Sequence, residues 1–101
     1  MKRTASMEAY YKSGIPYSHH HCEIEEDSGN IVIMVDVDGQ THAYRGKRMD
    51  QGYWKVESDT LHEEGTLHEE HDEDGRASCV GSWWGHGDRG AWIFRLGDPS
   101  P

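Results

Sequence analysis

The sequence is poor in apolar residues and has no long hydrophobic run. Hydrophobic residues make up 34% of the 101 positions, below the roughly 45–50% of an average globular domain. No stretch approaches the ~18 consecutive apolar residues of a membrane-spanning helix. The basic start of the chain, residues 1–14, also lacks the apolar core of a secretory signal peptide. We therefore expect one small domain in the cytoplasm that does not contact a membrane.

Cysteine is scarce as well. The chain contains only Cys22 and Cys79, and both are expected to be reduced thiols in a cytoplasmic protein. A Cys22–Cys79 disulfide is the alternative if the chain is exported. Four Trp and five Tyr partly compensate for the missing aliphatic residues, because each aromatic side chain buries a large area. This composition predicts a small, aromatic-rich core.

A sustained 3.6-residue period is also absent, which argues against a helical bundle. Short β-branched and aromatic segments recur instead at intervals of about 8–12 residues, with turn sequences between them. The predicted strands are residues 19–26, 31–37, 41–46, 53–57, 65–71, 76–84 and 91–96. This pattern predicts an all-β fold, an antiparallel meander of six to seven short strands that forms a small barrel or sandwich.

The two ends of the chain are expected to lie outside this meander. Residues 1–18 show no persistent period and are predicted to form a poorly structured or short-helical N-terminal arm. Residues 19–97 then make up the single antiparallel β domain, and residues 98–101 are a C-terminal tail.

Residues 85–90, GHGDRG, match the G-x-G-x-x-G spacing of a dinucleotide-binding loop. That loop holds a phosphate on the N-terminus of a helix that follows it. Here the next residues, AWIFRL at 91–96, alternate as a strand does. The stretch is therefore predicted to be a hairpin loop that displays His86, Asp88 and Arg89.

Positive charge is missing from one long segment. Residues 57–74 contain nine acidic residues and no Lys or Arg, while the formal net charge of the chain is −9. This charge repels nucleic acid and anionic membranes and favours a basic partner. A row of carboxylates can also imitate the phosphates of DNA. The leading prediction is a non-enzymatic binding or inhibitory protein that engages a basic protein partner through Glu63, Glu64, Glu69, Glu70, Asp72, Glu73 and Asp74. The alternative is that this acidic segment is a solvated loop that binds no partner.

Histidine is abundant, and its densest group is SHHHCEIEE at residues 18–26. On a strand, His19, His21 and Glu25 share one face, and imidazole with carboxylate can ligate a divalent transition metal. Their H-x-H-x-x-x-E spacing resembles the first half of a cupin metal motif over seven residues. The second half of that motif is absent from the C-terminal part of the chain. The resemblance implies an alternative function, a small metal-binding barrel, whereas the leading prediction has no cofactor.

The tryptophans predict an interface or a pocket. Trp83 and Trp84 are adjacent on a predicted strand, so they face opposite ways and only one can join the core. Together with Trp92 they are candidates for an interface or a ligand pocket, and a homodimer is the simplest explanation for the unmatched one. GYW at 52–54 and GSW at 81–83 resemble the G-x-W of lipocalin-type barrels, which implies a small-ligand-binding alternative.

An enzyme is not the leading prediction, because no nucleophile–base pair stands out. Cys22 has His20 as its neighbour on the same strand face, and that proximity could lower the pKa of the thiol. No third group that would orient the histidine, and no oxyanion donor, can be identified. Catalysis is therefore kept only as part of the small-barrel alternative.

Overall fold

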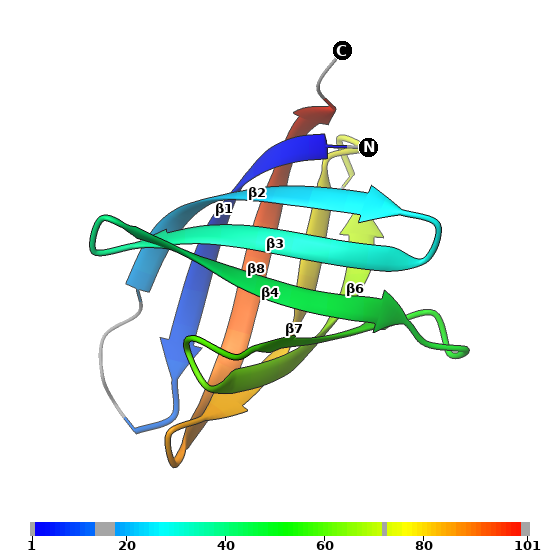
Figure 1. Cartoon of the computed structure of the whole chain (residues 1–101). Coiled ribbons are helices and arrows are strands. Elements are labelled where there is room, and N and C mark those ends of the chain that lie inside the picture. Colours follow the sequence, from blue (N-terminus) through cyan, green and yellow to red (C-terminus); the bar gives the residue numbers. More distant parts are fainter. Residues whose placement is uncertain (1, 14–17, 72, 100–101) are drawn as a thin grey trace.

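The structure is a computed structural model that describes residues 2–13, 18–71 and 73–99, and its strands close into one antiparallel barrel (Figure 1). Each strand pairs with its neighbours in the chain, and the last strand pairs with the first. The strands are β1 (Lys2–Tyr11), β2 (Ser18–Asp27), β3 (Asn30–Val37), β4 (Gln40–Arg48), β5 (Trp54–Ser58), β6 (Glu63–His71), β7 (Ala77–Gly85) and β8 (Asp88–Pro99).

The predicted all-β antiparallel meander is confirmed, and it takes the form of a barrel. The seven predicted strands correspond to β2–β8. The expected N-terminal arm is wrong for residues 2–11, which form the strand β1 between β2 and β8. Its inward positions include Ala5, Met7 and Ala9, and Ala is depleted in strands. The periodic signal was therefore weak, and β1 forms because both of its edges find partners.

The hairpins are tight because their turn residues adopt left-handed backbone conformations. Two-residue loops join β2 to β3, β3 to β4 and β7 to β8, at Ser28–Gly29, Asp38–Gly39 and His86–Gly87. All of these loop residues have positive φ, as a type I′ turn requires. GHGDRG at 85–90 is thus the predicted hairpin, with His86 and Gly87 at its tip.

The barrel interior is packed at its middle and polar at its ends. Ile33, Leu67 and Phe94 are 0% exposed, so the central layers are filled by side chains. The indole of Trp92, on β8, extends across the interior to Gly65 on β6. A Cβ atom on Gly65 would lie only 2.2 Å from Trp92 Cζ2, so the indole occupies the space of the missing side chain. The indole N–H of Trp92 donates to the Thr66 carbonyl at 2.9 Å, which satisfies its only polar group.

We name the two ends of the barrel by their side chains. The charged mouth is the end that contains Arg3 and Glu69, where β1, β3, β5 and β7 begin. The aromatic end contains Tyr44 and Glu63, where the other strands begin. Among the described residues, no helix has the length and apolarity to cross a membrane.

Candidate ligand site at the charged mouth

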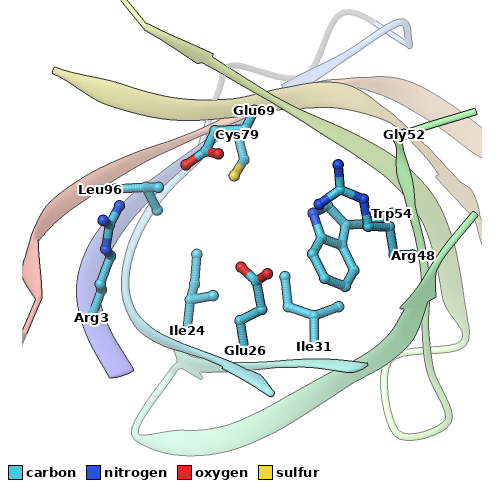
Figure 2. Close-up of a pocket in the computed structure, with 10 residues that line it drawn as sticks. All are labelled: Arg3, Ile24, Glu26, Ile31, Arg48, Gly52, Trp54, Glu69, Cys79 and Leu96. Atoms are coloured by element: carbon cyan, nitrogen blue, oxygen red, sulfur yellow. The ribbon is translucent and has the colours of Figure 1, made fainter. Parts of the chain in front are cut away.

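A pocket of about 210 Å³ opens at the charged mouth. All eight strands contribute to its wall, because the inward positions at this end converge when the sheet closes. Figure 2 shows these side chains arranged around the opening. The lining residues are Arg3, Ile24, Glu26, Ile31, Arg48, Gly52, Trp54, Glu69, Cys79 and Leu96.

The pocket carries two positive and two negative side chains. Arg3 and Arg48 belong to β1 and β4, and Glu26 and Glu69 belong to β2 and β6. Within the described residues, no ion pair joins Arg3, Arg48 or Glu69 to another side chain. The mouth therefore holds charges of both signs.

The two arginines lie in different environments. The Arg48 guanidinium lies over the Trp54 ring, 5.9 Å from its centroid, and this cation–π contact fixes it on the wall. Arg3 Nε is buried and has no hydrogen-bond acceptor in the described part of the chain. A buried N–H without an acceptor costs about 1–3 kcal/mol, so Arg3 is held in the wall at an energetic disadvantage.

The other side chains that line this pocket are apolar or unreactive. Ile24, Ile31 and Leu96 supply aliphatic surface. Burial, with the Glu69 and Glu26 carboxylates as weaker contributors, raises the pKa of the Cys79 thiol to about 11. Cys79 therefore remains a neutral thiol at physiological pH and is a poor nucleophile. The chemistry that this arrangement supports is binding through charge and apolar contact.

Cys22 is no better a nucleophile. It is 1% exposed, and burial, with the Asp36 carboxylate as a weaker contributor, raises the pKa of its thiol to about 12. The expectation that His20 lowers this pKa is wrong, because desolvation of the thiolate dominates. Both cysteines are free thiols, so the disulfide considered for an exported chain does not form here.

The predicted acidic surface is divided by the alternation of β6. Glu63 lines the aromatic end and Glu69 the charged mouth, whereas Glu64 and Glu70 are exposed on the outer face. Glu73 and Asp74 are exposed beyond the strand, and Asp72 lies outside the described residues. Alternation along a strand separates neighbouring carboxylates onto opposite faces, so Glu63 and Glu69 lie on the inner face of β6 and Glu64 and Glu70 on the outer face, although Glu69 is also exposed.

The residues of the metal hypothesis lie on the outer face of β2. His19, His21 and Glu25 are exposed, and they stand opposite Glu8, Ser6 and Lys2 of β1, respectively. Over the ranges that the structure describes, no group of three or more His, Cys, Asp or Glu side chains is arranged to hold a metal ion.

The tryptophans divide as their alternation predicts. Trp83 and Trp92 are buried, at 4% and 1% exposure, whereas Trp84 is 39% exposed. The indole N–H of Trp84 donates to Glu64 Oε2 at 2.9 Å, which gives the outward tryptophan a polar partner on the neighbouring strand.

Sequence reasoning missed most of the charged mouth. Only Glu69 was among the predicted site residues, and it was assigned to the protein surface. Arg3, Glu26 and Arg48 occur in segments whose alternation is weak or ends at a turn, so their inward orientation gives little signal. The one available indication was that Arg48 and Trp54 lie six residues apart, between and within the predicted strands 41–46 and 53–57.

Comparison of the chain with protein-family models, curated proteins and solved structures finds no match.

Proposed function

We propose that this protein is a binding protein for a small zwitterionic molecule with an apolar side chain, such as a free amino acid. The observation that carries the proposal is the pair of guanidinium and pair of carboxylate groups around one pocket of about 210 Å³. A ligand with one charge of each sign satisfies both kinds of group. Its apolar part would lie against Ile24, Ile31 and Leu96.

The physical reasoning is charge complementarity at the end of the barrel, where Glu26, Arg48 and Glu69 are exposed. Arg3 and Arg48 present forked donors that suit a ligand carboxylate. Glu69 presents an acceptor for a ligand ammonium group, and hydrogen bonds to charged groups contribute about 1.5–3 kcal/mol each. A ligand with only one of these charges would contact one kind of group and would lie beside side chains of its own sign.

The experiment compares L-leucine with two single-charge analogues, 4-methylpentanoate and 3-methylbutylamine. We expect leucine to bind at least about tenfold more tightly than either analogue in isothermal titration calorimetry, which corresponds to ~1.4 kcal/mol. Equal affinity for the three molecules, or no binding of leucine, would show that the charged mouth does not recognise both the carboxylate and the ammonium group of the ligand.

Two variants assign the charges to side chains. Glu69→Gln should weaken leucine by about tenfold, because the ammonium contact is lost, and should not weaken 4-methylpentanoate, which has no ammonium group. Arg3→Lys keeps the positive charge but removes the forked geometry, so both carboxylate ligands should weaken. Glu64→Gln is the matched control, since Glu64 lies on the outer face of the same strand.

A second candidate, docking of a basic protein partner, is favoured by one feature of the outer face. Glu57 and Glu64 are direct cross-strand partners and both are exposed, an arrangement that like-charge repulsion disfavours. Arg45 is the partner of Glu57 on the other side, and a basic partner protein would add positive charge beside Glu64. Replacing Glu57, Glu64 and Glu70 by Ser should abolish a salt-sensitive pull-down from host lysate, and retention of the same partner would eliminate this candidate.

A further inference from the structure

The aromatic end contains a second, smaller cavity of about 90 Å³. The rings of Tyr11, Tyr44, Trp83 and Trp92 line it, together with the Glu63 side chain. Among the described lining residues Glu63 is the one carboxylate, and none is Lys or Arg. The cavity therefore combines aromatic walls with negative charge, whereas the charged mouth carries both signs.

The rings are arranged edge to face. Tyr11 and Trp83 have centroids 5.1 Å apart at an interplanar angle of 77°, and Tyr44 and Trp92 are 5.3 Å apart at 86°. In this geometry the edge of one ring lies against a face of the other, so one face in each pair is already covered. Ring faces carry the negative part of the aromatic quadrupole and attract a cation that lies within about 6 Å.

The carboxylate is held in place by a tyrosine. The Tyr44 hydroxyl donates to Glu63 Oε1 at 2.5 Å, and burial, together with this hydrogen bond, raises the pKa of Tyr44 above its usual range. The hydroxyl therefore remains a donor, and Glu63 keeps a fixed position on the wall of the cavity. A preorganised carboxylate beside aromatic rings suits an organic cation.

We infer that the aromatic end binds a small organic cation, of the methylated ammonium class, between its aromatic rings and the Glu63 carboxylate. A trimethylammonium group is close in size to the cavity, and quaternary ammonium groups are held in proteins by aromatic cages. The site is separate from the charged mouth, because the fully buried Ile33, Leu67 and Phe94 fill the interior between the two ends. The inference does not depend on the function proposed for that mouth.

The test uses choline and its neutral isostere 3,3-dimethylbutan-1-ol, which have nearly the same shape. We expect choline to change the fluorescence of the buried tryptophans and to bind at least about tenfold more tightly than the alcohol. Equal binding of the two compounds would show that the cavity recognises shape alone and would overturn the inference. The inference would also be overturned if choline changed the tryptophan fluorescence no more than sodium chloride does at the same concentration.

Variants separate this site from the charged mouth. Glu63→Gln should weaken choline by about tenfold, because the charge is lost while Tyr44 can still donate to the amide oxygen. Glu69→Gln, at the opposite end, should leave choline binding unchanged. Tyr44→Phe retains the ring and the carboxylate but removes the hydrogen bond that holds Glu63, so choline should still bind, less tightly than to the unchanged protein and more tightly than to Glu63→Gln. Circular dichroism and thermal unfolding establish that each variant is folded, and unchanged choline affinity in folded Glu63→Gln would overturn the inference.

Discussion

Replacing Gly65 by Ala tests the packing of the barrel interior, because the Trp92 indole occupies the space that a side chain at position 65 would need. An Ala Cβ at this position would lie 2.2 Å from Trp92 Cζ2, 2.7 Å from Trp92 Cη2 and 2.7 Å from the Ser82 carbonyl oxygen. Trp92 is 1% exposed and packs edge to face against Tyr44 and Phe94. Two neighbouring rings therefore restrict the movement of the indole, although the cavity at the aromatic end lies beside it.

The expected magnitude follows from opposing contributions. Replacing Gly by Ala in a strand gains about 0.5–1 kcal/mol through the unfolded state. Overpacking costs about 1–3 kcal/mol, and displacement of Trp92 endangers its hydrogen bond to Thr66, worth about 0.5–1.5 kcal/mol. We expect Gly65→Ala to lower the free energy of unfolding by about 2–3 kcal/mol, which for this chain length corresponds to a fall in Tm of about 10–15 °C.

Urea denaturation followed by far-ultraviolet circular dichroism measures this loss. A double-mutant cycle with Trp92→Phe identifies its cause, because Phe lacks the ring atoms that meet the new methyl group. In that background the cost of Gly65→Ala should shrink by at least ~1 kcal/mol, with the Ser82 contact accounting for the remainder. Additivity within about 0.5 kcal/mol would refute the proposed contact.

Two further predictions concern the thiols and the outer tryptophan. Because the pKa of Cys22 is raised to about 12 and that of Cys79 to about 11, the stability they contribute is complete below about pH 8.5 and is lost as pH rises through those values. The fall in Tm between about pH 8 and pH 10.5 should therefore be smaller in a Cys22→Ala, Cys79→Ala double variant, and an identical fall would contradict this assignment. Trp84→Phe should cost less than about 1 kcal/mol in urea denaturation, because its hydrogen bond to Glu64 is exposed; a larger loss would indicate packing not seen here.

The strands were predictable where local chemistry is strong. Asp38 and Gly39 specify a tight turn by backbone preference alone, and the alternation on either side of them is sharp. Trp83 and Trp84 had to face opposite ways for the same local reason. β1 was not predictable, since its inward Ala5 and Ala9 carry little hydrophobic signal and its stability comes from pairing with β2 and β8.

The candidate sites were harder to predict because they depend on register around a closed sheet. Glu63 and Glu69 lie six residues apart and share the inner face of β6, yet they reach opposite ends of the barrel. In the sequence they look like members of one acidic segment. A strand rises about 3.3 Å per residue, so six residues cover most of the barrel's length.

The sequence by itself determined the all-β class, the positions of most strands and the tight turns, because propensity, period-2 alternation and positive φ are local properties. Tertiary structure decided which residues meet. Closure of β8 onto β1 brings Arg3, Glu26, Arg48 and Glu69 to one mouth and Tyr44 and Glu63 to the other end. This outcome depends on pairing between residues far apart in the chain, and no local pattern encodes that pairing.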